Sequence, residues 1–444
     1  MTVIQAGDRF GTPSFLLPEE FWAARPVLGH IRDAARRRLA PPDLTLGAVL
    51  ARVAVLADHR LRIPPTIGYP SPLGLFVCSA ASSSGGKTSS IQTGAALLPG
   101  DNPPNVELDA SPASGEALLD MFWGEEPTED GKGTVRARTV DAVLISLDEG
   151  SLLEKLDGRS GNTLLPFLLT GWSGATLGTD TLASVGRNGV KRRLAAGTYV
   201  LSLVAALQPK KAAHLLAQRD SGLAQRFTWL TDKDPGALEV QPESTAVVPL
   251  ELYRPSPVEL RGRDLPGGLL ALGRSDAISR ELWRAGWEKR QLDFEGDELD
   301  GHALLIRLRV AHCLALLDHR LDATDEDWLL AGMVSRVSAS VRRGLLGTVA
   351  ELAAAQDRVF VNREVLAAEA KELAREERFR SRCFAAVLAH VRGHGPVRTI
   401  PQNAISENHR PFVEAALVAH ERNGLIRRDD AGLWVPVRGV EGVL

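Results

Sequence analysis

The sequence predicts an α/β fold with helical regions before and after the sheet, and three observations support this prediction. Residues 71–250 alternate apolar runs of strand length with segments of helical periodicity, which is the pattern of a sheet covered by helices. Residues 1–70 and 276–343 show helical periodicity alone. From about residue 371 the order is helix, turn, helix and β-hairpin, as in a winged helix. We therefore expect four parts: a helical amino-terminal region (1–70), an α/β core (71–250), a linker with a helical subdomain (251–370) and a winged-helix-like module (371–444).

The composition is that of an ordinary globular protein. Of 444 residues, 44% are hydrophobic and 24% are charged, and the net charge of −3 excludes a uniformly basic nucleic-acid binder, although not one groove lined with Lys and Arg. The 3 cysteines, Cys78, Cys313 and Cys383, form no CxxC pair and predict neither a zinc site nor a disulfide framework. No apolar run approaches the roughly 18 residues of a membrane helix, and Met1–Phe10 does not resemble a signal peptide. We expect a cytoplasmic protein without a membrane segment.

Individual elements follow from periodicity and from Pro and Gly. The predicted strands of the core are Leu73–Ser79, Val140–Leu147, Tyr199–Leu207 and Phe227–Leu230. The predicted helices are Pro18–Ala40, Leu44–His59, Gly301–His319, Asp325–Arg343, Phe379–Val391 and Asn408–Asn423. Gly424–Val437, with its turn at Asp429–Gly432, is predicted to be the hairpin of the last module.

A phosphate-binding loop (P-loop) is predicted between the first strand of the core and the next helix. Its residues are Ala81, Ser82, Ser83, Ser84, Gly85, Gly86, Lys87 and Thr88, and Ser89 begins the helix. Small residues that lead from a buried strand into a helix let backbone N–H groups point at phosphates. Lys87 supplies the cation for the β and γ oxygens, and the Thr88 hydroxyl supplies a Mg²⁺ ligand. The alternative is a serine-rich turn that precedes a lysine by chance, but the flanking strand and helix favour an ATP and Mg²⁺ site.

An acidic pair ends the second predicted strand. Asp148 and Glu149 follow the apolar run Ala142–Leu147, and the spacing after Lys87 leaves room for a helix and one further strand. We expect Asp148 to hold Mg²⁺ through water and Glu149 to polarise the water that attacks the γ-phosphate. The alternative is an ordinary acidic turn after a strand. Together with the P-loop, the pair predicts hydrolysis as well as binding.

Two further polar residues are candidates for catalysis. Gln208 ends the strand Tyr199–Leu207 and is either a sensor of the γ-phosphate or an ordinary loop residue. Arg226 follows a Gly turn and precedes an apolar strand, so it is a candidate for an arginine that stabilises the transition state in a neighbouring subunit. A solvated surface arginine is the alternative for Arg226.

Basic residues in two places suggest contact with DNA. Arg187, Lys191, Arg192 and Arg193 surround an Asn-Gly turn that is either a pore loop or a solvated surface. In the last module Arg410 lies at the start of the predicted recognition helix, and Arg427 and Arg428 lie on the predicted wing. Glu407, Glu414 and Glu421 on the same helix oppose DNA, so docking of a protein is the alternative there.

With these motifs in place, residues 15–345 resemble the helicase-type ATPases of replication modules in bacteriophages, plasmids and actinobacterial integrative elements. The resemblance includes the P-loop, the acidic pair and the Gly222-Leu223-x-x-Arg226-Phe227 segment. Ser114–Leu118, His302–Asp318 and Asp325–Trp328 also fit. It implies a RecA-like or related ASCE core, a homo-oligomer that is often a hexameric ring on single-stranded DNA, and an inter-subunit role for Arg226. Related proteins are often fused to a primase–polymerase domain, for which residues 1–70 leave no room, so no synthesis activity is expected of this chain. The resemblance also makes a primase or another replication protein a possible partner.

Three functions remain open. The first is an ATP-dependent DNA helicase or translocase in the replication of a mobile element. The second is an ATP-dependent initiator or helicase loader that binds origin DNA without processive unwinding. The third is a P-loop scaffold that uses ATP only for assembly.

Overall fold

A computed structural model of the chain describes residues 15–65, 69–80, 85–99, 105–128, 132–147, 163–178, 193–217, 222–291 and 300–437, without the side chains of 214, 348–362 and 365. The chain divides into two compact units, unit 1 (Met1–Ala350) and unit 2 (Glu351–Leu444), which are described separately. No helix in the described ranges is both long enough and apolar enough to cross a lipid bilayer.

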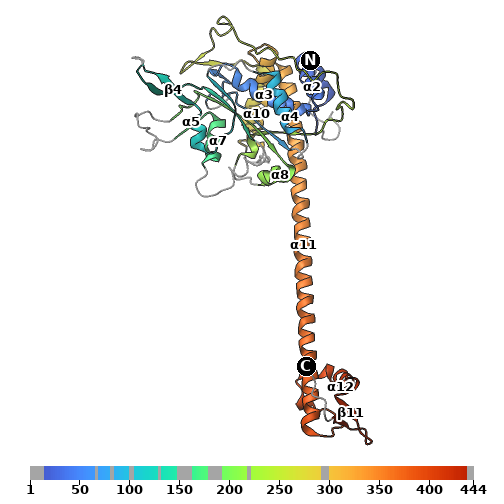
Figure 1. Ribbon diagram of the computed structural model, residues 1–444. Coiled ribbons are helices and arrows are strands. Elements are labelled where there is room, and N and C mark those ends of the chain that lie inside the picture. The colour runs from blue at the N-terminus through green and yellow to red at the C-terminus, as the bar shows by residue number, and fades with distance from the viewer. Residues whose placement is uncertain are drawn as a thin grey trace. The chain divides into compact units, whose positions relative to one another are not determined.

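The secondary structure is mixed (Figure 1). The helices are α1 (Glu19–Ala23), α2 (Pro26–Arg37), α3 (Pro42–Leu56), α4 (Lys87–Leu97), α5 (Gly115–Asp120), α7 (Leu164–Ser173), α8 (Pro209–Ala217), α9 (Asp276–Glu288), α10 (Ala303–Leu317), α11 (Asp325–His394) and α12 (Val413–Arg422), with the 3₁₀ turns η3 (Ala224–Arg226), η5 (Gln402–Ala404) and η6 (Glu407–Phe412). The strands are β1 (Leu61–Arg62), β2 (Phe76–Ala80), β3 (Val106–Ala110), β4 (Trp123–Pro127), β5 (Thr134–Arg138), β6 (Ala142–Leu147), β7 (Val200–Leu207), β8 (Phe227–Thr231), β9 (Asp264–Leu265), β10 (Leu269–Ala271), β11 (Ile426–Arg428) and β12 (Trp434–Pro436).

Unit 1 is built on a parallel five-stranded sheet in the order β3-β6-β7-β2-β8. The α/β fold and the four predicted strands of the core are confirmed, with β2, β6, β7 and β8 in their places. The sequence analysis did not locate β3, which alternates buried and exposed positions over five residues and has no continuous apolar run. Because all five strands are parallel, their carboxyl ends meet at one end of the sheet and their amino ends at the other.

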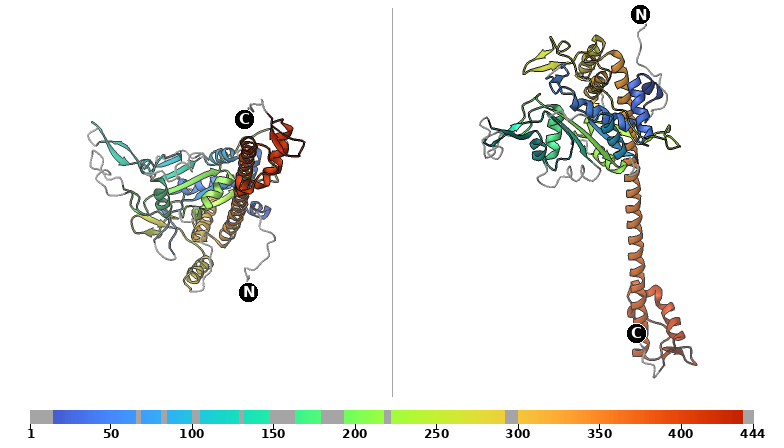
Figure 2. Two further views of the ribbon diagram at one scale, coloured as in Figure 1. Left: turned by 90° about the horizontal axis from the view of Figure 1, so that it is seen from below. Right: turned by 45° about the horizontal axis from the view of Figure 1, so that its top comes forward.

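Helices cover both faces of this sheet (Figure 2). Val77 of β2 pairs with Val204 of β7, so Val77 and Leu201 point to opposite faces. A Cβ added to Gly47 of α3 would lie 2.7 Å from the Val77 side chain, and one added to Gly171 of α7 would lie 2.5 Å from that of Leu201. Thus α3 covers one face and α7 the other.

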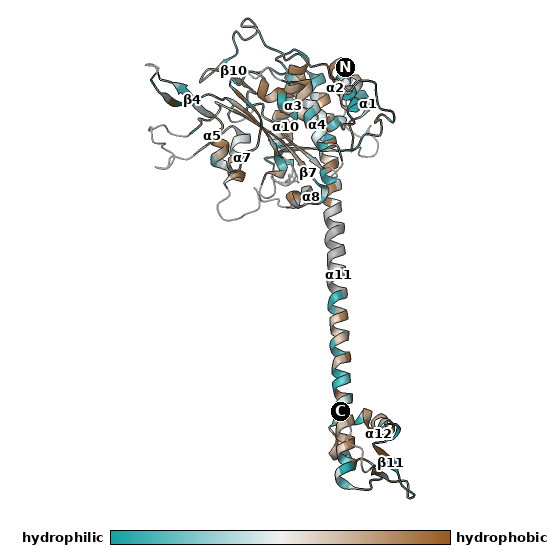
Figure 3. Ribbon diagram, in the orientation of Figure 1, coloured by the Kyte–Doolittle hydropathy of each residue, from teal (hydrophilic) through white to brown (hydrophobic). Residues whose placement is uncertain are grey.

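Helix α3 is the centre of the unit 1 core. All of its residues are buried, and most of them are hydrophobic (Figure 3), as expected of a helix enclosed by other elements. Its buried Arg52 donates to the carbonyl oxygen of Leu98 at 3.0 Å and forms an ion pair with Asp109 at 2.9 Å. The predicted run Pro18–Ala40 is divided into α1 and α2, because Pro26 begins a new helix.

Outside the sheet, unit 1 has two small β structures. Strands β9 and β10 lie within the segment 251–275, which was predicted to be a linker or connecting loop, and β10 pairs both with β9 and with β1 near the amino terminus of the unit. The hairpin β4–β5 lies between β3 and β6 in the chain.

Helix α11 is longer than predicted. The sequence analysis expected helices only at Asp325–Arg343 and Phe379–Val391, whereas α11 is continuous from Asp325 to His394. The segment 363–378 is rich in Ala, Glu, Arg and Leu, which favour helix, but all its described side chains are exposed. A helix without a buried face has no apolar stripe, so periodicity does not reveal it.

Unit 2 has its own small core. Among the described residues its buried apolar side chains are Cys383, Val387, Val391, Ile405, Ala416, Ile426 and Trp434. Strands β11 and β12 form an antiparallel hairpin, as predicted, and Val397 forms an antiparallel bridge with Trp434 of β12. The predicted helix Asn408–Asn423 is in two parts, because its first residues belong to η6, which contains Pro411, and α12 follows.

Candidate active site

The described part of the P-loop lies between a central strand and a helix, as predicted. Strand β2 ends at Ala80, and α4 begins at Lys87. Residues Ala81, Ser82, Ser83 and Ser84 lie outside the described residues. Gly86 is the N-cap of α4 with φ of 71°, a left-handed conformation that glycine adopts without strain.

The start of α4 presents backbone N–H groups at the carboxyl end of the sheet. The first backbone hydrogen bond of this helix runs from the Ser90 N–H to the Gly86 carbonyl oxygen at 2.9 Å. The N–H groups of Lys87, Thr88 and Ser89 come before it and therefore have no acceptor within the helix. The Ser89 hydroxyl donates to the same carbonyl oxygen at 2.8 Å, which fixes the turn. The Thr88 side chain is exposed and therefore accessible to a ligand.

Strand register places Gln208 beside this loop. Leu207, the last residue of β7, pairs with Ala80, the last residue of β2. Gln208 directly follows Leu207, so it lies at the same end of the sheet at which β2 leads into the P-loop. Strand β7 lies between β2 and β6, and Leu147 of β6 pairs with Ala205. The next residues in the sequence, Asp148 and Glu149, lie outside the described residues.

An aspartate that the sequence analysis missed lies against the loop. Asp232 follows β8, its side chain is only 4% exposed, and it forms an ion pair with Lys233 at 3.1 Å. A Cβ added to Gly85 would overlap the Asp232 carboxylate, so the close approach requires glycine at position 85. The signal that would have revealed Asp232 is the one used for Asp148, namely an acidic residue directly after a buried strand.

A pocket of about 180 Å³ opens beside these glycines. One wall is an ion pair in which the Arg36 guanidinium of α2 donates two hydrogen bonds of 3.0 Å to Asp234, and these bonds raise the pKa of Arg36. The pocket is lined by Arg36, Leu39, Ala40, Pro41, Gly85, Gly86, Asp232, Asp234 and Ala237. Helix α2 and the segment after β8 are thus joined next to the P-loop.

A second buried aspartate lies near this pocket. Asp43, at the start of α3, accepts a hydrogen bond from the Leu17 amide at 3.1 Å and is 3% exposed. Burial raises its pKa to about 7, and the negative charge of Asp234 acts in the same direction, against the effect of the Leu17 hydrogen bond. No local sequence pattern predicts this shift in the pKa of Asp43.

Arg226 lies at the opposite end of the sheet. Arg226 is the last residue of η3 and directly precedes β8. The five to six residues along β8, at about 3.3 Å each, place it on the order of 17–20 Å from the carboxyl end of the sheet. Its guanidinium lies over the Trp172 ring at 5.2 Å and donates to the Gly222 carbonyl oxygen at 2.5 Å. Burial lowers the pKa of Arg226. The structure does not bring Arg226 and Lys87 of one chain together.

Trp172 is the centre of a group of cationic and aromatic side chains. Arg309 lies over the same ring at 4.1 Å, and the His302 ring approaches it edge-on at 4.9 Å. Arg309 is fully buried and donates to the carbonyl oxygens of Gly74 and Trp172. Burial lowers the pKa of His302 to about 4, and the neighbouring Arg226 and Arg309 act in the same direction.

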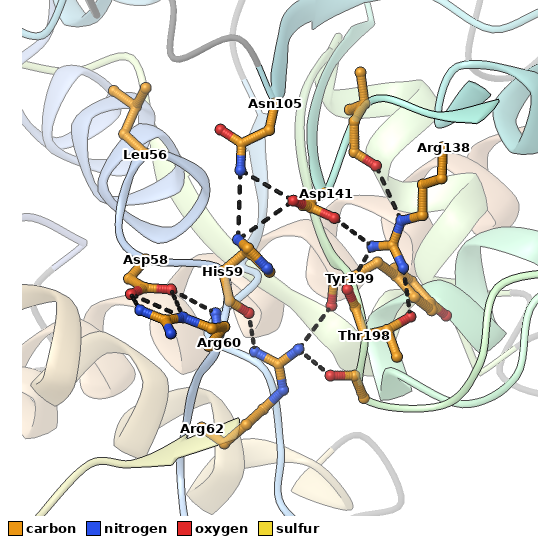
Figure 4. Close-up of polar contacts among 12 residues, drawn as sticks. Leu56, Asp58, His59, Arg60, Arg62, Asn105, Arg138, Asp141, Thr198 and Tyr199 are labelled. Carbon is orange, nitrogen blue, oxygen red and sulfur yellow. Dashed lines mark hydrogen bonds and ion pairs between the residues drawn. The ribbon is translucent and has the colours of Figure 1, made fainter. Parts of the chain in front are cut away.

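The amino end of the sheet also holds a polar network (Figure 4). Asp141, which precedes β6, forms an ion pair with Arg138 at 2.8 Å, lies 3.4 Å from Nδ1 of His59, and accepts a hydrogen bond from Asn105 at 3.0 Å. Buried Arg62 donates to backbone carbonyl oxygens, including that of Leu61 at 2.8 Å, and burial lowers its pKa to about 10. These contacts connect loops to the amino ends of strands, and most of the hydrogen-bond donors and acceptors in the network have a partner within it.

The remaining predicted site residues are in other places. Arg187, Lys191 and Arg192 lie outside the described residues, and Arg193 is exposed just before a bridge between Leu194 and Leu177. In unit 2, Arg410 donates to the Gln402 carbonyl oxygen at 3.2 Å. Arg427 and Arg428 are exposed on β11, and Arg428 lies over the Trp434 ring at 4.5 Å.

Within the described ranges no group of three or more His, Cys, Asp or Glu side chains is placed to hold a metal ion. Mg²⁺ bound with a nucleotide needs few protein ligands, because phosphates and waters fill its other positions. The amides at the start of α4 and the exposed Thr88 hydroxyl are compatible with such a ligand, whereas the space beside Gly85 is already filled by the Asp232 carboxylate. Compared with models of known protein families and with curated protein sequences, the chain matches none.

Proposed function

We propose that unit 1 is a P-loop ATPase core of the ASCE type and that the chain is an ATP-driven DNA helicase or translocase. The strand order is the observation on which the proposal rests. Strand β7, which ends at Leu207 just before Gln208, lies between β2, the strand that precedes the P-loop in the sequence, and β6, the strand that precedes Asp148 and Glu149. The carboxyl ends of β2 and β6 are therefore two strand spacings apart, about 10 Å, which is room for phosphates, Mg²⁺ and a water. This order supports the RecA-like or related core that the resemblance implies.

Each residue has a role that follows from its position. Lys87 and the amides at the start of α4 bind the β- and γ-phosphates, and Thr88 and Asp148 hold Mg²⁺, which neutralises charge that develops on the phosphates. Glu149 orients and polarises the attacking water, and Gln208 contacts the γ-phosphate from the neighbouring strand. The pocket beside Gly85 and Gly86 receives the rest of the nucleotide, between α2 and the segment after β8.

Arg226 acts in a neighbouring subunit. Because it lies at the amino end of the sheet, on the order of 17–20 Å from the carboxyl end, it cannot reach the nucleotide of its own chain. In a head-to-tail ring each subunit presents one surface to the active site of the next. The position of Arg226 therefore supports a homo-oligomer, and by resemblance a hexameric ring around single-stranded DNA with a primase or other replication protein as partner.

Unit 2 favours a second candidate, an initiator or helicase loader. The order of α11, η6, α12 and the β11–β12 hairpin, with the bridge from Val397 to Trp434, supports the winged helix predicted from the sequence. A winged helix binds duplex DNA or docks a protein. The exposed side chains of α12 include Glu414, Val418 and Glu421, which suit a protein better than phosphates.

The proposal is tested by measuring ATP hydrolysis with and without an oligothymidylate. We expect hydrolysis that the oligonucleotide stimulates, loss of ATP binding in Lys87→Ala, and binding without hydrolysis in Glu149→Gln. Strand separation on a forked duplex distinguishes a helicase from a loader, which would bind a specific duplex instead. Absence of ATP hydrolysis, with Lys87→Ala indistinguishable from the parent protein in nucleotide binding, would exclude the ATPase.

A further inference from the structure

Helix α9 exposes two tryptophans that the proposed ATPase does not use. Trp283 and Trp287 are 61% and 58% exposed, although tryptophan is usually well buried. They lie four residues apart and therefore on the same side of the helix, about 6 Å apart along its axis. The opposite side of α9 is anchored in unit 1 through buried Ile278 and Leu282.

Arginines surround these rings on the same side. Arg280, Trp283, Arg284, Trp287 and Arg290, here called the Trp–Arg face, recur at helical spacing and are all exposed. Within α9, Asp276 in the first turn is the acidic residue on this side.

Two acidic residues of α9 have cationic partners. Glu281 accepts from Arg307 at 3.0 Å and from the Trp328 indole N–H at 2.7 Å, so its charge is directed toward unit 1. Glu288 pairs with Arg284 at 2.9 Å. The Trp–Arg face therefore carries three arginines against Asp276 and Glu288, which is a small excess of positive charge around two large rings.

We propose that the Trp–Arg face is a binding site for single-stranded nucleic acid, in which Trp283 and Trp287 stack on neighbouring bases and the arginines contact phosphates. Exposed rings beside guanidinium groups are the means by which proteins bind single strands without reading their sequence. Bases stack on indole rings, and phosphates complement the positive charge of this face. The proposal rests on the proposed function, because a translocating ATPase needs a site that accepts any sequence.

The test is the affinity of the full chain for a fluorescently labelled oligothymidylate. Because stacking contributes about 1–3 kcal/mol per base, Trp283→Ala and Trp287→Ala should each raise the Kd about 5- to 100-fold. Trp283→Tyr and Trp287→Tyr keep a ring and should stay within a few-fold of the parent protein. Arg280→Ala should reduce the slope of log affinity against log salt by about 0.7. Tyr69→Ala, which removes a ring that is 94% exposed elsewhere in unit 1, is the matched control and should bind normally.

The outcomes separate this inference from the proposed function. If oligothymidylate stimulates ATP hydrolysis but the alanine variants bind it as the parent protein does, the Trp–Arg face is not the site and the ATPase stands. If the alanine variants lose affinity although the parent protein has no ATPase activity, the site stands without the ATPase. If the variants change only the oligomeric state in sedimentation, the face docks a second copy of the chain and our proposal is wrong.

Discussion

The two ends of the central sheet differ in the surroundings of their charged side chains. At the carboxyl end, Gly85 lies directly against buried Asp232, helix α4 begins there, and a pocket of about 180 Å³ opens beside it. At the amino end, a pocket of about 350 Å³ is lined by His59 and Asn105, but the guanidinium groups of Arg62 and Arg309 donate to backbone carbonyl oxygens and are completely buried. The carboxyl end therefore has helix amides next to its pocket, whereas the buried arginines of the amino end are engaged with the backbone.

This difference changes how the arginines of unit 1 are interpreted. Burial lowers the pKa of Arg309 to about 9 and that of Arg62 to about 10, because a guanidinium loses hydration there. Their bonds to carbonyl oxygens compensate for this loss, so their role is structural. Arg226 is at the same end but only partly buried, and it rests on Trp172. Partial exposure is what an arginine that acts on another subunit requires.

The largest expected effect is at this amino end. Arg226→Ala should lower kcat for ATP about 10³- to 10⁵-fold, because an arginine that stabilises transition-state charge contributes that much. Nucleotide binding should change little, since Arg226 lies far from the P-loop of its own chain. Steady-state hydrolysis and binding of a fluorescent ATP analogue measure the two effects.

Mixing two inactive proteins tests whether Arg226 acts between subunits. Arg226→Ala has an intact P-loop and Lys87→Ala has an intact arginine, so mixed oligomers contain complete sites and should recover activity. Recovery would not occur if Arg226 acted within its own chain, or if its loss only disturbed folding.

An intermediate effect is expected at the carboxyl end, from Asp43. Its pKa is about 7 in the folded protein and about 3.9 in the unfolded chain. Between these values the folded state binds more protons, so the contribution of Asp43 to stability is complete below about pH 4 and is lost as the pH rises toward 7. Asp43→Asn keeps an acceptor for the Leu17 amide and removes the charge. From about pH 5 to about pH 8, the free energy of unfolding of this variant should therefore rise relative to the parent by about 3 kcal/mol.

Denaturant unfolding at several pH values measures this difference. Asp33→Asn, which removes an exposed carboxylate of α2, is the matched control. A pH-independent difference for Asp43→Asn would mean that Asp43 ionises normally in the folded state.

The smallest expected effect concerns Trp172. Trp172→Phe weakens the contact with the Arg226 guanidinium, which is worth about 0.5–2 kcal/mol for tryptophan, so kcat should fall about 2- to 30-fold at unchanged KM. In the Arg226→Ala background the same substitution should have no further effect on kcat. An equal loss in both backgrounds would show that Trp172 acts through packing and not through Arg226.

Much of the carboxyl end was predictable from local sequence. Strands β2, β6, β7 and β8 were found because a strand buried on both faces is a continuous apolar run. The alternating strand β3 and the middle of α11 were missed, because neither has such a run nor an apolar stripe. Asp232 carries the same local signal as Asp148, an acidic residue directly after a buried strand, but its contact with Gly85, which is far away in the sequence, is seen only in the tertiary structure.

The sequence by itself determined that a strand leads through a glycine-containing loop into a helix that begins with Lys87 and Thr88, since these features depend on neighbouring residues. Only the tertiary structure decided the order of the strands, and with it which side chains share an end of the sheet. It placed Gln208 beside the P-loop, Asp232 against Gly85, and Arg226 at the far end against Trp172. The physical reason is that parallel pairing brings together segments more than a hundred residues apart, and no local pattern records which strands are neighbours.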